Sequence, residues 1–287
     1  MRPLQINDKS MVEKRNLLYN IRMSELNFTN LYAWRDKYDF HLHEIGDVLF
    51  IVNKKEDRFY FSQPLGETED LRTILLNLMA DFDIGSCCLK KCDQAMVKVL
   101  EDLDLEVSSE AIRDDYDYIY DFESLRSLRG KANHKKKNHV NKFLKSYDWT
   151  YEIMGPATFD GVYQVMDTWF EGDKDQEEYR AIDRVIRAWD QLSVCGGLLY
   201  VDSKPVAFAI GEIYHEDTLL MHFEKGDTAY HGVYSMMTHE FLSRFENIKY
   251  VNREQDLGIE GLRKSKLSYH PIGFIEKYNV RISERDQ

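Results

Sequence analysis

The chain has 287 residues, of which 43% are hydrophobic and 31% are charged, with 15 glycines and 5 prolines. These proportions are typical of a folded globular protein and exclude a disordered or collagen-like one. The net charge of −12 opposes a protein that coats nucleic acid with its whole surface. The longest apolar stretch, residues 192–201, is far shorter than a membrane span, and the start of the chain has no secretory signal. We therefore expect a cytoplasmic protein without a transmembrane segment.

The first half of the chain alternates helical and extended patterns. Ser10 and Glu13 have the spacing of a capping box, which predicts a first helix through Ile21. The remaining patterns predict a helix over Asn27–Arg35, strands over Phe40–Ile45, Val48–Asn53 and Arg58–Ser62, a helix over Leu71–Met79, a strand over Ile84–Leu89, a helix over Asp93–Leu103 and a strand over Asp115–Phe122.

The second half repeats this order of elements. It predicts helices, a three-stranded meander, a helix, a strand, a short helix and a closing strand. The ranges are Leu125–Tyr147, Trp149–Met154, Phe159–Phe170, Tyr179–Leu192, Leu198–Val201, Val206–Ile213, Thr218–Glu224, Val233–Phe245, Ile248–Asn252, Gly261–Leu267 and Phe274–Val280. The repetition predicts two tandem domains, residues 1–120 and 121–287, each mixed α/β around a mostly antiparallel sheet.

The charges are distributed unevenly along the chain. Residues 101–123 contain ten acids and one base, whereas residues 126–145 contain eight bases and no acid. Such a run can be a solvated helix face, but in an acidic protein it repels itself unless an anion offsets it. The basic segment is therefore predicted to bind a polyanion. Its candidate binding residues are Arg129, Lys131, Lys135, Lys136, Asn138, His139 and Lys142.

Cysteine and histidine spacing predicts no metal site. The four cysteines match no common zinc pattern, and no histidine pair has metal-binding helix spacing. Cys195 could be a nucleophile, but its sequence context favours the start of a buried strand. Tyr116, Tyr118 and Tyr120 alternate with polar residues, which favours strand core over base stacking.

A second polar constellation, Tyr250–Pro271, follows a predicted strand. It contains acids, bases and the glycines Gly258 and Gly261. It can be a surface turn with local ion pairs, but a loop at a strand end is also a common place for binding and catalytic groups. We favour a site there.

These two segments, Arg129–Phe143 and Asn252–Pro271, together with Glu276-Lys277-Tyr278, resemble the bacterial family related to the C-terminal domain of phosphatidylglycerol lysyltransferases. The stretch Asn-Arg-Glu-Gln-Asp-Leu-Gly, which begins at Asn252, is the most specific part. The resemblance covers most of the chain. It implies two tandem acyltransferase folds of the GNAT type, as in the Fem-type peptidoglycan aminoacyltransferases. It also implies an enzyme that transfers an aminoacyl group from charged tRNA to an amine or hydroxyl, with a lipid or a cell-wall precursor as candidate acceptor.

The resemblance implies catalytic and binding roles for acids and bases of the second segment and for Glu224. Glu254 and Asp256 are candidates for the general base or for binding an α-ammonium group, and Glu224 is another candidate. Candidates for donor binding or carbonyl polarisation are Arg253, Arg263, Lys264 and Lys266, and further pocket residues are Asn252, Gly258, Ser268 and Tyr269.

Two alternatives stay open. A CoA-dependent N-acetyltransferase would bind the CoA pyrophosphate at the helix that follows the central strand, but the segment Glu224–Ser235 lacks the usual Gly-x-Gly/Ala pair. The other alternative is a domain without catalytic activity that binds RNA or an acidic partner. We expect no bound cofactor, with aminoacyl-tRNA as a donor substrate.

Overall fold

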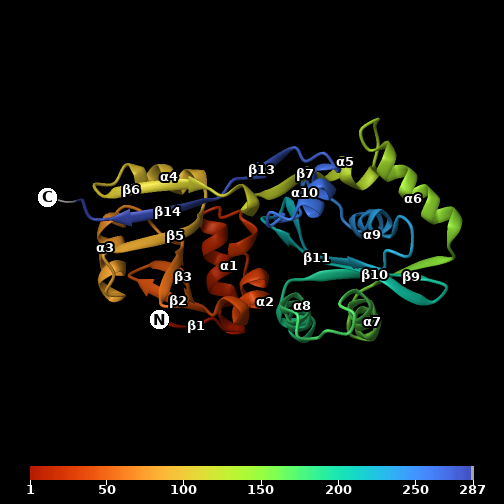
Figure 1. Cartoon of the computed structure of the whole chain (residues 1–287), viewed down its shortest axis with the longest axis horizontal. Helices are drawn as coiled ribbons and strands as arrows, with labels where there is room; N and C mark the ends of the chain where they lie inside the picture. The colour runs from red at the N-terminus through yellow and green to blue at the C-terminus, as the bar shows by residue number, and fades with distance from the viewer. Residues whose placement is uncertain (286–287) are drawn as a thin grey trace. The chain divides into compact units, whose positions relative to one another are not determined.

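Two seven-stranded sheets organise residues 1–285, which this computed structural model describes (Figure 1). The chain divides into two units. The first comprises residues 1–117, 255–258 and 275–285, and the second comprises residues 118–254 and 259–274.

The sheet of the first unit is antiparallel apart from one parallel pair, β4 and β5. Its strand order is β1-β2-β3-β4-β5-β14-β6. The strands are Arg2–Pro3 (β1), Phe40–Ile45 (β2), Val48–Lys55 (β3), Arg58–Ser62 (β4), Ser86–Cys92 (β5), Glu106–Ala111 (β6) and Tyr278–Ser283 (β14). The α-helices of this unit are Lys9–Leu18 (α1), Phe28–Tyr38 (α2), Leu71–Asp81 (α3) and Gln94–Glu101 (α4).

Strand β3 shows why this sheet needs helices on both faces. Its first five residues are all buried. Because side chains alternate along a strand, Val48, Phe50 and Val52 share one face, where they join the apolar cluster that α3 supplies. Leu49 and Ile51 occupy the other face, and α2 contacts β3. The apolar run Val-Leu-Phe-Ile-Val is therefore a strand covered on two sides.

The sheet of the second unit has the order β13-β7-β12-β11-β10-β9-β8, and β11 and β12 pair in parallel. Its strands are Asp117–Asp121 (β7), Trp149–Ile153 (β8), Cys195–Val201 (β9), Lys204–Tyr214 (β10), Thr218–Gly226 (β11), Tyr250–Asn252 (β12) and Gly273–Ile275 (β13). The α-helices are Phe122–Ser127 (α5), His134–Ser146 (α6), Phe159–Trp169 (α7), Glu177–Arg187 (α8), Val233–Leu242 (α9) and Glu260–Leu267 (α10). Helices α7 and α8 lie on one face of the sheet, and α6 and α9 lie on the other (Figure 1).

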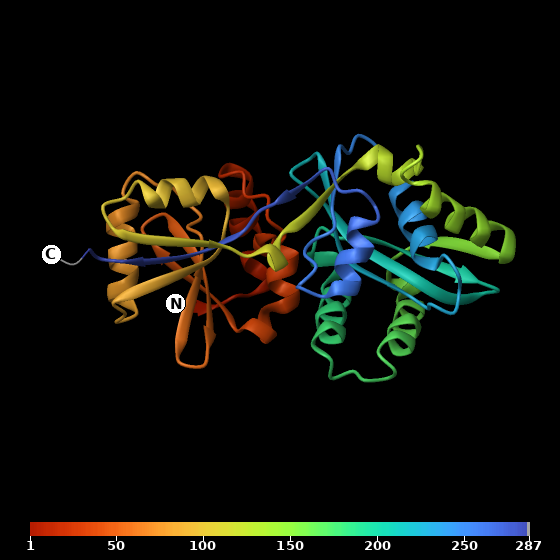
Figure 2. The same ribbon diagram turned by 45° about the horizontal axis from the view of Figure 1, so that its top comes forward.

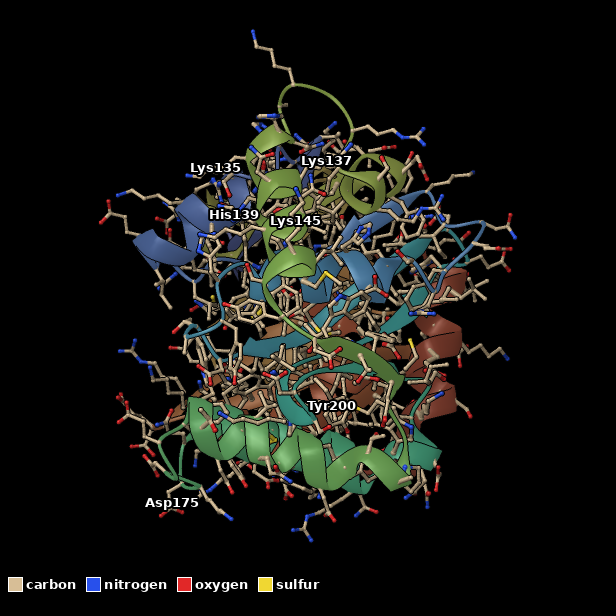
Figure 3. The ribbon with its side chains drawn as sticks, turned by 90° about the vertical axis from the view of Figure 1, so that its right-hand side faces the viewer. Lys135, Lys137, His139, Lys145, Asp175 and Tyr200 are labelled. Carbon is tan, nitrogen blue, oxygen red and sulfur yellow. The ribbon has the colours of Figure 1, made fainter. Side chains whose placement is uncertain are left out.

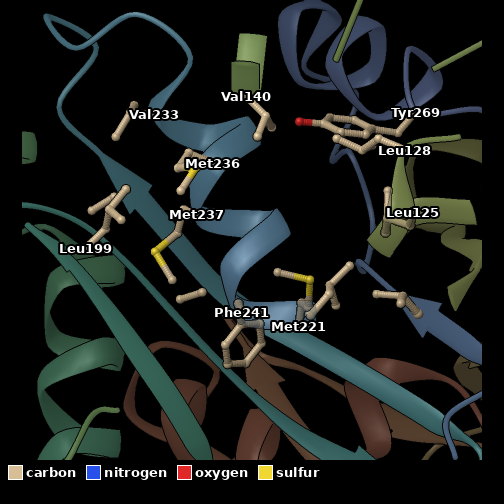
Figure 4. Packing of buried hydrophobic residues seen from close by; sticks show 14 of the residues in the cluster. Leu125, Leu128, Val140, Leu199, Met221, Val233, Met236, Met237, Phe241 and Tyr269 are labelled. Atoms are coloured by element: carbon tan, nitrogen blue, oxygen red, sulfur yellow. The ribbon is translucent and has the colours of Figure 1, made fainter. Parts of the chain in front are cut away.

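Helix α9 forms the centre of the core of the second unit. Its residues Met236, Met237 and Phe241 are buried against the sheet (Figure 4). Val140 and Phe143 bury the apolar stripe of α6 in the same cluster. The core therefore places the basic helix beside α9.

Several sequence-based element predictions were wrong. The helix expected over Leu125–Tyr147 is two helices, because Leu128 and Gly130 have left-handed backbones and end α5. The first helix begins at Lys9 and not at a Ser10 cap. Strand β6 was missed because its residues are polar and mostly exposed, as at a sheet edge.

The last strand also differs from the expected arrangement. The strand expected over Phe274–Val280 to close the second repeat is two strands, β13 and β14. Strand β14 pairs with β5 and β6 in the first sheet (Figure 2). In the first sheet, β14 lies between β5, which belongs to the parallel pair, and the outer strand β6. In the second sheet, β7 has the corresponding position between β12 and the outer strand β13. Sequence order alone does not reveal this exchange, because both strands have ordinary strand patterns.

Candidate active site

The parallel pair β11 and β12 separates early. Their pairing runs from Thr218 and Tyr250 to Leu220 and Asn252, after which β12 ends, although β11 continues to Gly226. Side chains from the later part of β11 and from the residues that follow β12 therefore meet without a backbone ladder between them. We call this place the fork. It consists of His222, Glu224, Arg253 and Glu254.

His222 enters the fork through a β-bulge. Ile210 pairs with Phe223 and Gly211 with Met221, so His222 is the extra residue of β11. Its side chain is fully buried, with Nδ1 3.0 Å from Glu254 and Nε2 3.3 Å from Glu212. Burial alone would lower the pKa of His222, but the two carboxylates outweigh burial and raise it to about 9. The imidazole is therefore a cation at neutral pH, held between two carboxylates.

Glu254 owes its orientation to local backbone geometry. Its φ of 56° is left-handed, and its backbone N–H donates to Asn252 Oδ1 at 2.8 Å. Asn252 is completely buried. The Lys266 ammonium donates to the backbone carbonyls of Arg253 and Glu254. Asn252 and Lys266 thus support the fork by fixing the chain after β12.

Arg253 and Glu224 form the second charged pair of the fork. Arg253 Nη2 donates to Glu224 Oε2 at 2.5 Å, and the Thr238 hydroxyl of α9 donates to Glu224 Oε1 at 2.6 Å. Burial opposes the charge of Arg253, but Glu224 outweighs it and raises the Arg253 pKa. Arg253 Nη1 is buried and has no hydrogen-bond partner within residues 1–285. A buried guanidinium N–H without an acceptor can receive an oxygen atom of a ligand.

Tyr269, just after α10, connects the fork to the basic helix. Its buried ring lies 4.9 Å from the Arg253 guanidinium and 3.8 Å from the Lys136 ammonium, measured to the ring centre. Its hydroxyl lies 3.3 Å from the hydroxyl of Ser235 on α9. Figure 4 shows the Tyr269 ring beside Leu128, above α9. Lys136 is half-buried, and burial, then Arg253 and Lys135, lower its pKa to about 8.

The other bases of the basic segment are on the outside of the second unit. Arg129 and Lys131 are exposed on the loop before α6, and Lys135, Asn138 and Lys142 are exposed on the helix. Figure 3 shows Lys135, Lys137 and Lys145 along α6. His139 is half-buried with its ring 5.1 Å from that of His231, and burial, His231 and the lysines lower its pKa. These residues form a cationic surface, which we call the α6 surface.

Three predicted site residues are not among the residues of the fork. Asp256 belongs to the first unit, where it is fully buried, accepts the N–H of Gly258 at 2.9 Å and lies 3.5 Å from Arg113. These contacts hold the loop after β12, and the role of Asp256 as a base stays a prediction. Gly258 has a φ of +73°, and a Cβ there would lie 2.8 Å from the carboxylate of Asp114. Ser268 is exposed and caps α10 by donating to the Ser265 carbonyl at 2.6 Å.

Arg263 and Lys264 occupy α10 itself. Lys264 is exposed and pairs with Glu260 at 2.5 Å, which is an ordinary i,i+4 surface pair. Arg263 is half-buried on the same helix. The structure thus brings Glu224, Arg253, Glu254, Tyr269 and Lys136 together, with Asn252 and Lys266 behind them.

Sequence reasoning missed His222, Glu212, Ser235 and Thr238. The one available signal for His222 was a single ionisable side chain within the apolar run of β11. Ser235 and Thr238 are three residues apart, so they share a face of α9. Only the packing of α9 against the fork reveals their contacts.

Cys195 and the tyrosine strand behave as predicted. Cys195 is the first residue of β9, and burial raises the pKa of its thiol to about 12, which opposes a nucleophilic role. Tyr118 and Tyr120 are core residues. Within residues 1–285 no cluster of histidine, cysteine and carboxylate side chains is suited to a metal ion.

The two sheets, in which β4 and β5 and, correspondingly, β11 and β12 pair in parallel, define a tandem fold of the GNAT-like acyltransferase type. A tandem GNAT protein from the clavulanic acid biosynthesis pathway has the same fold, with a TM-score of 0.54, 9% identity and coverage of 100% of this chain and 98% of the other. The chain belongs to the family described as phosphatidylglycerol lysyltransferase, C-terminal, whose model matches residues 17–281. It is therefore a relative of aminoacyltransferases, and the family and fold expected from the sequence are confirmed.

Individual relatives extend this result. A conserved protein of unknown function from Bacteroides thetaiotaomicron VPI-5482 is 28% identical, covers 99% of each chain and has a TM-score of 0.89. The C-terminal domain of a putative lysylphosphatidylglycerol synthetase from Agrobacterium fabrum shares the fold, with a TM-score of 0.69, 13% identity and coverage of 97% of this chain and 92% of the other. An uncharacterised protein of Mycoplasmoides gallisepticum is 26% identical over 172 residues, which are 58% of this chain and 56% of that protein.

None of the helices within residues 1–285 has the length and apolar character needed to cross a bilayer.

Proposed function

We propose that this chain is an aminoacyltransferase that moves an aminoacyl group from a charged tRNA to a hydroxyl or amine of a lipid or cell-wall precursor. The fork is its active site, and the α6 surface binds the donor. Family membership supports the reaction class. The observation that carries the proposal is the unpartnered Nη1 of Arg253 at the fork.

Arg253 is suited to stabilise negative charge on a reacting ester. Glu224 balances the guanidinium charge through Nη2 and so fixes the direction of the buried Nη1. A fixed donor in a water-poor site stabilises a developing oxyanion more than a mobile one in water does. We therefore assign Arg253 to the carbonyl oxygen of the aminoacyl ester, and Glu224 and Thr238 to the positioning of Arg253.

Helix α6 connects this site to a polyanionic donor. Lys136 is near the fork, whereas Lys135, Asn138 and Lys142 face solvent on the same helix. Arg129 and Lys131 extend the cationic surface onto the preceding loop. A phosphate backbone bound there would release counterions in proportion to the number of bases it meets.

The start of α9 favours tRNA over CoA as the donor. The loop before α9 contains Asp227, whose carboxylate already accepts the backbone N–H of Ala229 at 3.0 Å. A carboxylate at this position repels a pyrophosphate. Gly232 begins α9 with a φ of +87°, but the Gly-x-Gly/Ala pair of CoA-binding loops is missing from Glu224–Ser235.

The test is transfer of label from an aminoacyl-tRNA pool to lipid vesicles and to peptidoglycan precursors. We expect label on one acceptor class with the wild-type chain, and loss of at least 100-fold in rate for Arg253→Met. The matched control is Arg72→Met, on the exposed face of α3. Thermal stabilisation by CoA without any aminoacyl transfer would support the acetyltransferase alternative, and salt-sensitive tRNA binding without transfer would support the binding-domain alternative.

A further inference from the structure

Two ion pairs cross the gap that opens between β11 and the residues after β12. His222 Nδ1 lies 3.0 Å from Glu254, and Arg253 Nη2 donates to Glu224 at 2.5 Å. His222 and Glu224 are two residues apart on β11, so the two crossings are about 7 Å apart along the strand. The Lys266 ammonium fixes the carbonyls of both Arg253 and Glu254. The fork therefore presents a guanidinium and a carboxylate on consecutive residues of one fixed segment.

The geometry around His222 requires its imidazole to be a cation. Nδ1 faces Glu254, and Nε2 lies 3.3 Å from Glu212. An ionised carboxylate only accepts hydrogen bonds, and a neutral imidazole has a single N–H. The ring can therefore face two ionised carboxylates favourably only when both of its nitrogens are protonated. The raised pKa of His222 agrees with this argument.

Glu254 is the member of this cluster that a ligand can reach. Its side chain is 16% exposed, whereas that of Glu212 is 3% exposed and that of His222 is 0% exposed. A carboxylate beside a protonated imidazole is stabilised in its ionised form, so it is a weak base. Glu254 is therefore better suited to hold a cation than to take a proton during the reaction.

An aminoacyl ester carries a cation close to its reacting carbonyl. The α-ammonium is bonded to the carbon next to the ester carbonyl, and the proposed function assigns the carbonyl oxygen to Arg253. An aminoacyl group with one hydrogen bond to Arg253 and another to Glu254 has a length close to the separation of the two crossings. The acetyl group of acetyl-CoA, in contrast, has no cation for Glu254.

We infer that Glu254 binds the α-ammonium of the aminoacyl group, and that His222, held in turn by Glu212, is the residue that positions this carboxylate. This inference rests on the proposed function. Contacts to the ammonium and to the carbonyl oxygen together hold the aminoacyl group in one orientation. His222 touches no reacting atom and acts through Glu254.

The experiment compares two donors that differ in one group. The first is a tRNA charged with the amino acid that the transfer assay identifies. The second is the same tRNA charged with the matching α-hydroxy acid, in which a hydroxyl replaces the ammonium. The readout is the ratio of their single-turnover transfer rates with the full chain. A general loss of folding or of tRNA binding lowers both rates and leaves the ratio unchanged, so a change in the ratio reports the ammonium contact.

Three variants are compared with wild type. Glu254→Gln removes the negative charge, His222→Gln removes the cation that positions it, and Glu246→Gln, at an exposed position between α9 and β12, is the control. We expect Glu254→Gln to reduce the preference for the aminoacyl donor by about 10-fold or more, as for a lost hydrogen bond between charged groups. His222→Gln should reduce it by at least about threefold. The control should keep the wild-type ratio.

The outcomes separate this inference from the proposed function. A wild-type ratio in Glu254→Gln overturns the inference and leaves the proposed function in place. A reduced ratio in Glu254→Gln with a wild-type ratio in His222→Gln overturns the positioning role of His222. If His222→Gln does not fold, Glu212→Gln takes its place, because Glu212 holds His222, and the same reduction is expected. A wild-type chain that transfers neither donor overturns the proposed function, and the inference with it.

Discussion

Arg253 Nη2 and Glu224 Oε2 meet at 2.5 Å at the place where β11 and β12 have ceased to pair. The parallel strands part after Leu220 and Asn252, and this ion pair connects them at the fork, as the pair of His222 and Glu254 also does. Because both side chains are mostly buried, the pair contributes to the stability of the fold and is also part of the proposed site.

We expect the contributions of Arg253 and Glu224 to the free energy of unfolding to be strongly coupled. Removing one partner of a buried pair leaves the other charge without compensation, which costs about 3–5 kcal/mol. We expect Arg253→Met to lower the free energy of unfolding by about 3 kcal/mol in urea titrations. The double variant Arg253→Met with Glu224→Leu should recover most of this loss. Strictly additive losses would show that the two residues do not depend on each other.

His222 predicts a loss of stability on the alkaline side. Its pKa is raised from 6.5 to about 9 in the folded chain, so between these values the folded state binds more protons than the unfolded state. The contribution is complete below pH 6.5 and is lost as pH rises through 9. The measurement is the urea midpoint of wild type minus that of His222→Gln at pH 6 and at pH 9.5. The difference should shrink at the higher pH, and a difference that grows would contradict the charged state of His222.

The α6 surface predicts salt-dependent binding of tRNA. Lys135→Gln and Lys142→Gln should each reduce the slope of log K against log salt by roughly one. Lys55→Gln, at the exposed end of β3, should leave the slope unchanged. Binding measured by fluorescence anisotropy from 50 to 300 mM salt tests this. Equal slopes for all three variants would remove α6 from the interface.

Gly232 and Gly130 provide a matched test of the packing between α6 and α9. Both glycines have left-handed backbones, with φ of +87° and +89°. A Cβ at Gly232 would lie 2.7 Å from the His139 carbonyl oxygen, whereas one at Gly130 would meet nothing within 4 Å. Gly130→Ala should therefore cost about 1–2 kcal/mol for its backbone alone.

Gly232→Ala should destabilise the chain clearly more than Gly130→Ala does, because the start of α9 must also move away from α6. It should lower the transfer rate as well, since α6 carries Lys136. Differential scanning calorimetry of the two variants gives the comparison. Equal losses would mean that the two helices can separate without strain.

The sequence predicted most elements of the fold because hydrophobic periodicity is a local signal. Strand β3 and helix α3 were found for this reason. Strand β6 was missed because an exposed edge strand needs no apolar face. The exchange that places β14 in the first sheet depends on contacts between residues nearly two hundred positions apart, as between Ile282 and Cys87. No local pattern encodes such a pairing.

The candidate site was predicted in part for a similar reason. Charged residues after a strand end indicated Arg253 and Glu254, and the absence of counter-acids indicated the basic segment. The sequence did not predict that α6 begins after a break at Leu128 and Gly130. Without the start of the helix, the face on which Lys136 lies could not be predicted. Asp256 was indistinguishable from Glu254 by sequence, although its side chain is fully buried in the first unit.

The most direct test of the account is a single-turnover transfer assay with labelled aminoacyl-tRNA, vesicles of phosphatidylglycerol and a peptidoglycan precursor. We predict that the wild-type chain moves label to one of these acceptors, and that Arg253→Met binds the same tRNA but transfers at least 100-fold more slowly. A wild-type chain that binds charged tRNA and moves label to no acceptor would contradict it.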